Sequence, residues 1–173
     1  MKSSELLIRR LTPQNAPQYR TLRLQAFRDH PEAFTSSYEE EAEKPMASSA
    51  QRLAANSSVK FWGAFVNGVL AGLVGLEREQ RLKARHKGLV IGMYVAPEHA
   101  RRGIARALLN TLLLDARASQ LEMLTLTVTC GNQGAENLYL EAGFVSYGIE
   151  PGVIKVENRR FDKNHMFLPL VPP

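Results

Sequence analysis

The feature that most constrains the fold is a change of sequence pattern between residues 89 and 114. Residues 89–95 (LVIGMYV) are almost entirely apolar, and residues 96–102 form a short basic stretch with one proline. Apolar residues then recur at helical spacing, with Ile104, Leu108 and Leu112 on one face. The pattern predicts a strand, a tight turn and a largely buried helix, in that order. A strand that leads directly into a helix is typical of an α/β domain.

The junction between this strand and this helix predicts a binding site for a phosphate-like anion. The first backbone N–H groups of a helix have no intrahelical partner, and the helix dipole places partial positive charge there. Arg101, Arg102 and Arg106 add side-chain charge, and Gly103 lacks the Cβ atom that would hold a ligand away from the backbone. The alternative is a solvated basic pair at an ordinary helix start.

Two common phosphate-binding loops do not match this stretch. No Gly-Lys-Ser/Thr ending follows, so the stretch is not a P-loop. Only one glycine stands where the dinucleotide-binding fingerprint needs three.

The other elements predict a mixed sheet with helices on both of its faces. Asn67-Gly68 separates two apolar runs, residues 59–66 and 69–76, and is a strong hairpin signal. We expect further strands at 5–11, 121–128, 145–147 and 166–170, helices at 12–30, 47–56 and 132–144, and an irregular hairpin at 151–164.

Length and composition limit the class of protein. A chain of 173 residues with 45% hydrophobic residues is expected to form one domain, residues 1–173. No apolar run approaches the roughly 20 residues that cross a bilayer, and residues 1–10 lack a secretory core, so we expect a cytoplasmic protein without membrane contact. The single cysteine, Cys130, excludes an intrachain disulfide, and the histidines are scattered, so we expect no metal site.

The net charge of +5 suits binding to nucleic acid or to an anionic small molecule. The basic runs at 78–87 and 101–106 have no interleaved aromatic residues on which single-stranded bases would stack. We therefore expect no nucleic acid as principal ligand. A nucleic-acid-binding protein is nevertheless one alternative for the function of this chain. Its affinity for nucleic acid would fall steeply as the salt concentration rises.

Two motifs resemble signatures of the GNAT superfamily of N-acetyltransferases, in particular its small bacterial members. The first is the loop that holds the pyrophosphate of acyl-CoA. Val95 and Pro97 match its lead-in, and Gly103 and Ala105 match its last two positions. Ala100 departs from the motif, because Gln or Arg is usual there. This departure affects one polar contact and leaves the backbone amides in place.

The second motif follows the predicted strand at 121–128 and reads Asn132-x-x-Ala135-x-x-Leu138-Tyr139-x-x-x-Gly143-Phe144. Each match is moderately specific, but their order and separation make the pair much more specific than either alone. The resemblance covers nearly the whole chain. It implies an α/β fold with a mixed, mostly antiparallel central sheet, helices on both faces and a splayed pair of central strands.

The resemblance also implies acetyl-CoA as co-substrate and assigns residues to it. The pantetheine arm would pair with the backbone of Met93, Tyr94 and Val95 between the splayed strands, and a backbone N–H near Val95 would stabilise the oxyanion. The pyrophosphate would rest on amides of the helix start, and the second motif would face the arm and thioester from the other side. The residues concerned are Arg101, Arg102, Gly103, Ile104, Ala105 and Arg106 at the helix start, and Asn132, Ala135, Asn137 and Tyr139 in the second motif.

Three residues are candidates for catalysis. The Tyr139 hydroxyl could stabilise or protonate the departing thiolate, although a core aromatic is the simpler interpretation. A lysine-like amine has a pKa of about 10.4, so the reaction also needs a base. Glu77 and Glu79, at the end of a strand expected beside the motif strand, should point to the same face and could serve. Surface charge at a strand end is the alternative for both.

These expectations together describe an enzyme that transfers an acetyl group to a primary amine by direct attack in a ternary complex. The alternative is a non-catalytic acyl-CoA-binding sensor or interaction module. The acceptor is an unidentified small-molecule or peptide amine, and we expect residues 31–56 and 148–165 to shape its pocket. The acidic run at 39–43 is either a solvated face or a lure for a cationic acceptor. Many GNAT proteins pair, so the resemblance also permits a homodimer.

Overall fold

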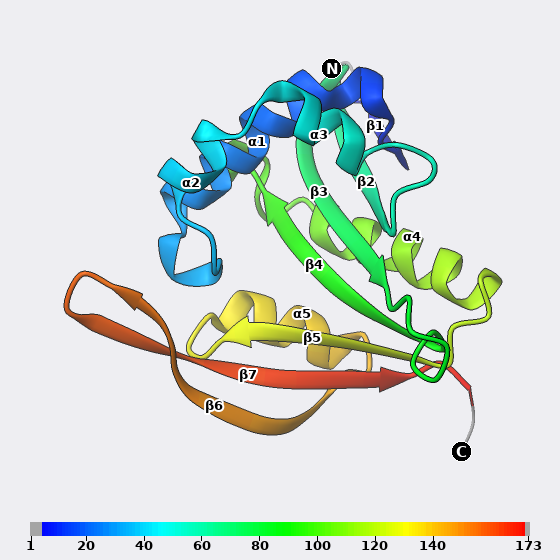
Figure 1. Ribbon diagram of the computed structural model, residues 1–173, viewed down its shortest axis with the longest axis vertical. Helices are drawn as coiled ribbons and strands as arrows, with labels where there is room; N and C mark the ends of the chain where they lie inside the picture. The colour runs from blue at the N-terminus through cyan, green and yellow to red at the C-terminus, as the bar shows by residue number, and fades with distance from the viewer. Residues whose placement is uncertain (1–4, 172–173) are drawn as a thin grey trace.

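The computed structural model describes residues 5–171, in which seven strands form one sheet flanked by five helices (Figure 1). The helices are α1 (Ala16–Asp29), α2 (Tyr38–Glu43), α3 (Met46–Arg52), α4 (Ile104–Ala118) and α5 (Gln133–Glu141). The strands are β1 (Leu6–Arg10), β2 (Val59–Val66), β3 (Val69–Arg78), β4 (Lys87–Val95), β5 (Met123–Thr129), β6 (Val145–Val156) and β7 (Arg159–Pro169). Short 3-10 turns lie at Pro13–Asn15, Pro31–Ala33 and Pro97–His99.

The strand order is β1-β2-β3-β4-β5-β7-β6, and only the central pair, β4 and β5, is parallel. This pair is joined only where residues 87–89 face residues 123–125. Figure 1 shows the two strands side by side at this end and diverging towards their carboxyl ends. The predicted mixed, mostly antiparallel sheet with a splayed central pair is confirmed.

Two hydrophobic cores cover the two faces of the sheet. Along β2, the side chains of Phe61 and Phe65 pack with α1, whereas Trp62 and Ala64 pack with α4, as strand alternation requires. Tyr139 of α5 belongs to the same core as α4. We call these sides the α1 face and the α4 face. The prediction that helices cover both faces of the sheet is confirmed.

Strand β4 carries a bulge beyond its last pair with β5. Ile91 faces Gly75 and Tyr94 faces Leu73, so β4 has two residues, Gly92 and Met93, between pairs that are separated by one residue on β3. Gly92 has a φ of 63°, a conformation that side-chain-bearing residues rarely adopt. The bulge therefore changes the direction of the backbone in the part of β4 that the resemblance assigns to the co-substrate.

The carboxyl-terminal hairpin is longer than the sequence predicted. β6 and β7 pair from Val145 and Phe167 to Val156 and Arg159, whereas we expected short strands at 145–147 and 166–170. Most side chains of β6 are exposed, so this edge strand lacks the apolar alternation on which the prediction relied. A register shift between Glu150 and Ile154 accommodates the proline and glycine at 151–152.

The acidic run at residues 39–43 lies in α2. This helix begins with a capping box, in which Ser37 Oγ accepts from the Glu40 N–H at 3.2 Å and Glu40 Oε2 accepts from the Ser37 N–H at 2.7 Å. The helix predicted at 47–56 corresponds to α3, which ends at Arg52. Among residues 5–171, no helix combines the length and the apolar character that crossing a bilayer requires.

Candidate active site

The loop between β4 and α4 presents five backbone amides that have no acceptor within the described residues. The first helical hydrogen bond of α4 joins the Ala107 N–H to the Gly103 carbonyl at 3.0 Å. Among residues 5–171, no oxygen accepts from the N–H groups of Arg101 and of residues 103–106. Gly103 has a φ of 75°, and a Cβ atom there would have no neighbour within 4 Å, so the approach is open. These are the features of an anion-binding helix start.

The three arginines of this turn differ in their pairing. Arg101 and Arg102 are exposed on the loop, and no ion pair within residues 5–171 involves either of them. Arg106 instead pairs with Glu141 at the end of α5, so this ion pair links the first turn of α4 to α5. Two of the three predicted charges are thus available to a ligand without breaking a protein contact.

Residues 93–95 of β4 have a neighbouring strand on one edge only. Tyr94 and Val95 pair with Leu73 and Gly72 of β3, whereas pairing with β5 ends at Leu89. The edge towards β5 can therefore pair with an extended molecule. The Tyr94 side chain projects to the α1 face, where its hydroxyl donates to Asp29 Oδ2 at 2.7 Å. Burial and this carboxylate raise the pKa of Tyr94.

Helix α5 positions Tyr139 in the core of the α4 face. Its side chain is 6% exposed, and its ring packs edge-to-face on Phe144 with centroids 5.8 Å apart. Burial raises the pKa of the Tyr139 phenol, and no atom within residues 5–171 forms a hydrogen bond with its hydroxyl. Ala135, one turn earlier, packs partly against the same core. The phenol is therefore a protonated donor without a protein partner.

The two asparagines of the second motif have local roles in α5. Asn132 is the N-cap, as predicted, and its side-chain oxygen accepts from the Ala135 N–H at 3.3 Å. Asn137 is exposed, and its Oδ1 accepts from Gln133 Nε2 at 2.8 Å. Asn137 lies two residues before Tyr139, about 200° away around the helix, so the structure does not bring these two side chains together.

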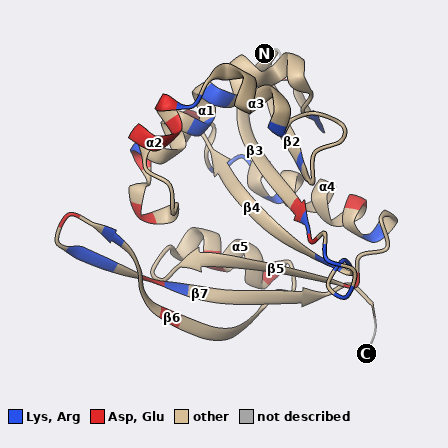
Figure 2. Ribbon diagram, viewed as in Figure 1, with Lys and Arg blue, Asp and Glu red and all other residues tan. Residues whose placement is uncertain are grey.

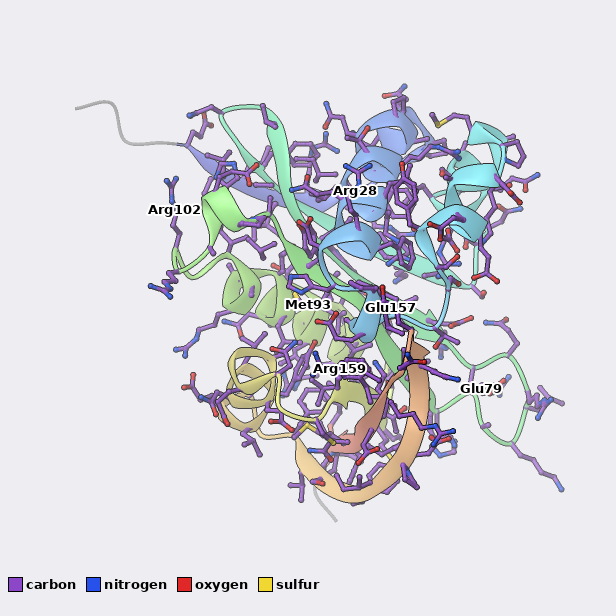
Figure 3. All side chains as sticks on the ribbon, turned by 90° about the vertical axis from the view of Figure 1, so that its left-hand side faces the viewer. Arg28, Glu79, Met93, Arg102, Glu157 and Arg159 are labelled. Carbon is purple, nitrogen blue, oxygen red and sulfur yellow. The ribbon has the colours of Figure 1, made fainter. Side chains whose placement is uncertain are left out.

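Glu77 and Glu79 line one depression, together with Leu89 and Thr125. Glu77 alternates with Leu76 of the α4 core, so it lies on the α1 face, opposite Tyr139. Glu79 is exposed, and its Oε1 accepts from the N–H groups of Arg81 and Gln80, which lower its pKa. Figure 3 shows Glu79 and Arg102 on opposite sides of Met93. Glu77 pairs with Leu89 of β4, whereas Glu79 lies beyond the end of β3, so Glu77 is the nearer of the two to the central strands.

A charged cavity that the sequence did not predict lies between α1, α2 and α3. It measures about 300 Å³, and its charged lining residues are Arg20, Arg23, Lys44, Arg52 and Glu41. Arg23 stands one helical turn from Tyr19 and one from Phe27, both buried. A charged residue on a buried helical stripe is the signal that could have identified this site from the sequence.

A second cavity of about 570 Å³ lies between the α1–α2 connection and the tip of the β6–β7 hairpin. The two predicted pocket-forming segments do meet here, through Phe34 and Tyr38 on one side and Ile154 and Glu157 on the other. Figure 2 shows acidic residues gathered on α2 and basic residues at the start of β7. Figure 3 shows Glu157 and Arg159 at this hairpin tip, below Arg28 of α1.

Lys163 of β7 joins strands β5 and β7 to the turn that follows α1. Its ammonium group is buried and donates to the Ala33 carbonyl at 2.8 Å and to Thr129 Oγ1 at 2.9 Å. Thr129 Oγ1 in turn donates to the Glu32 carbonyl at 2.9 Å. Burial lowers the pKa of Lys163. β5 and β7 are thereby fixed to the turn that follows α1.

Cys130, at the end of β5, has little nucleophilic character. Partial burial, and then the carboxylates of Glu136 and Asp162, raise the pKa of its thiol, so the thiol is protonated at neutral pH. Among residues 5–171, no three His, Cys, Asp or Glu side chains are grouped so that they could hold a metal ion.

Comparisons with known proteins agree with this geometry. A model of the acetyltransferase (GNAT) family matches residues 23–144, the greater part of the chain. No curated protein matches the chain in sequence. An acetyltransferase of the GNAT family from Streptococcus pneumoniae has a similar structure, with a TM-score of 0.86 and 28% identity over 95% of this chain and 99% of that one.

Two more distant structures share the fold. The Salmonella typhimurium protein YncA, solved with its cofactor acetyl-CoA, gives a TM-score of 0.81 and 20% identity over 98% of this chain and 96% of that one. The ribosomal-protein-S18-alanine N-acetyltransferase of Escherichia coli gives a TM-score of 0.73 and 20% identity over the same shares of the two chains. With its splayed central strands, its open helix start and the matching family model, this chain belongs to the GNAT family of acetyltransferases.

Proposed function

We propose that this protein transfers the acetyl group of acetyl-CoA to a primary amine by direct attack in a ternary complex. One observation carries the proposal: within residues 5–171, five unpartnered amides lie at the start of α4, after the open edge of β4. A diphosphate at these amides and an extended arm along β4 are the two recognition elements that coenzyme A requires.

The residues present fit acetyl-CoA, which supplies an activated thioester. The amides of residues 101–106 and the side chains of Arg101 and Arg102 would hold the diphosphate. The backbone of Met93, Tyr94 and Val95 would pair with the pantetheine arm along the edge that β5 leaves free. Gly103 matters because its open Cβ position lets a ligand approach the backbone.

The catalytic groups act from opposite faces of the sheet. Tyr139 approaches from the α4 face, and its raised pKa keeps the phenol protonated, so it would donate a hydrogen bond to the thiolate. Glu77 lies on the α1 face and would accept the proton of the amine directly or through water. The protonated thiol of Cys130 favours direct attack over an acyl-cysteine intermediate.

The test combines binding with turnover. Calorimetry with coenzyme A should give saturable binding, and a panel of primary amines with acetyl-CoA should release thiol for at least one amine. Binding without any thiol release would instead support the sensor or interaction module. Absence of binding to coenzyme A would contradict both functions.

A further inference from the structure

Arg23 is a half-buried cation that has no ion-pair partner within residues 5–171. Within residues 5–171, no carboxylate lies within ion-pair distance of its guanidinium, and no oxygen accepts a hydrogen bond from it. Its guanidinium packs over two aromatic rings. The guanidinium carbon is 4.6 Å from the centre of the Phe27 ring and 5.5 Å from the centre of the Phe34 ring. Burial lowers its pKa. The five N–H donors of this partly exposed guanidinium are therefore available to a ligand.

The neighbouring arginine on α1 shows the contrast. Arg20 donates to the Ala42 carbonyl at 2.7 Å and also to the Lys44 carbonyl, so it fastens α1 to the end of α2. The carboxylate of Glu41, the one acidic lining residue, pairs with Lys44. The contacts that hold α1 and α2 together at this cavity therefore do not involve Arg23. Its N–H donors remain available to a ligand.

The cavity around Arg23 suits a small anion-bearing molecule. Its volume of about 300 Å³ is at the lower end of ligand sites. Arg23 and Arg52 supply charge, and Ser48 and Ser49 supply hydroxyl groups. Four cationic side chains against one carboxylate disfavour a polyamine or another polycation. The acidic run does not reverse this balance, because Glu39 and Glu40 are exposed and Glu40 serves in the cap of α2.

Arg23 also lies against the strand where the thioester is expected. Its Nη1 atom is 2.9 Å from the position that a Cβ atom on Gly92 would occupy, and Gly92 precedes Met93. An anion held by Arg23 would thus lie beside the bulge of β4, next to Met93. The acceptor must then carry its amine close to its anionic group.

We propose that the acceptor is a free α-amino acid and that Arg23 binds its carboxylate. The proposal rests on the proposed function, since it names the acceptor of the same reaction. In an α-amino acid one carbon separates the carboxylate from the amine, which matches the short spacing between Arg23 and the bulge of β4. Arg52 and the serines at the cavity wall complete the binding site for the acceptor.

The test compares matched acceptors. Thiol release from acetyl-CoA is measured with each proteinogenic L-amino acid and with its carboxamide, which keeps the side chain and amine but lacks the carboxylate. At least one amino acid should exceed its carboxamide in kcat/KM by about tenfold or more, as the loss of charge-assisted hydrogen bonds implies. Carboxamides or polyamines that react as well as every amino acid would overturn the inference while leaving the acetyltransferase function intact.

Variants then assign the effect to Arg23. Arg23→Gln should reduce the preference for the carboxylate to about one, and Arg23→Lys should restore part of it because it keeps the charge. Arg117→Gln, an exposed arginine on α4, is the control and should keep the wild-type preference. Calorimetry of the N-acetylated product should show the same order of affinities. An unchanged preference in Arg23→Gln would overturn the role of Arg23, and thermal unfolding checks that each variant is folded.

Discussion

The guanidinium of Arg23 occupies the place where Gly92 would carry a side chain, with Nη1 2.9 Å from the expected Cβ position. Glycine at residue 92 is therefore required for the Arg23 guanidinium to keep this position. Its φ of 63° imposes the same requirement independently. The bulge, the half-buried Arg23 and the adjoining cavity form one structural unit on the α1 face.

Gly92→Ala should lower the free energy of unfolding and raise the KM for the acceptor by about tenfold. A left-handed backbone costs a side chain about 1 kcal/mol or more, and the new methyl group would also displace Arg23. Gly68→Ala is the matched control, because Gly68 has a φ of 82° and its Cβ position has no neighbour within 4 Å. Denaturant unfolding and steady-state kinetics measure both effects. Equal results for the two variants would contradict the role assigned to the contact.

Tyr139→Phe should lower kcat by about tenfold or more while leaving the affinity for coenzyme A unchanged. Its hydroxyl has no hydrogen-bond partner within the described chain, so the free energy of unfolding should change by no more than about 1 kcal/mol. Tyr147→Phe, at a tyrosine that is 59% exposed, controls for removal of a phenol. A normal kcat in Tyr139→Phe would reduce Tyr139 to a core aromatic.

Glu141→Gln should tighten binding of coenzyme A severalfold, because it frees Arg106 at the start of α4. Arg106→Gln should weaken binding. Both residues are mostly exposed, so either change should alter the free energy of unfolding by less than about 1 kcal/mol. Calorimetry at low and physiological salt measures the affinities. Identical affinities in both variants would mean that Arg106 does not contact the ligand.

The parts of the fold that the sequence predicted are those in which local chemistry and burial agree. Asn67-Gly68 specifies the β2–β3 hairpin, and Asn132 caps α5 as its side chain requires. The apolar stripe of α4 follows from Leu108 and Leu112, both fully buried. The β6–β7 hairpin could not be predicted in this way, because most β6 side chains face solvent and carry no period-two signal.

In the candidate site, too, some features follow from local sequence and others depend on the tertiary structure. The anion-binding turn depends on backbone amides and one glycine, which a local motif can reveal. Arg23 is a charged residue on the apolar stripe of α1, but its role needs α1, the bulge at Gly92 and the α2–α3 cavity to be seen together. The positions of Glu77 and Glu79 relative to the splay depend on strand register, which single-sequence patterns do not determine.

Lys163 should make stability depend on pH in the alkaline range. Burial lowers its pKa in the folded protein, so the unfolded chain binds this proton more tightly, and stability should rise with pH towards the ordinary lysine value of about 10.4. Lys163→Met removes this titration and leaves the Ala33 carbonyl unpaired, at a cost of about 1–3 kcal/mol. The difference in unfolding free energy between wild type and variant should therefore grow from pH 7 to 10. A constant difference would contradict the lowered pKa.

The central claim is that the amides at the start of α4 bind the diphosphate of acetyl-CoA. The most direct measurement is a titration of the ¹⁵N-labelled protein with coenzyme A, followed by amide chemical shifts, with pantetheine as the matched ligand that lacks the diphosphate. We predict that coenzyme A produces its largest shifts at residues 101–106 and that pantetheine leaves these amides nearly unchanged. Shifts of equal size with both ligands, or shifts confined to other parts of the chain, would contradict the account.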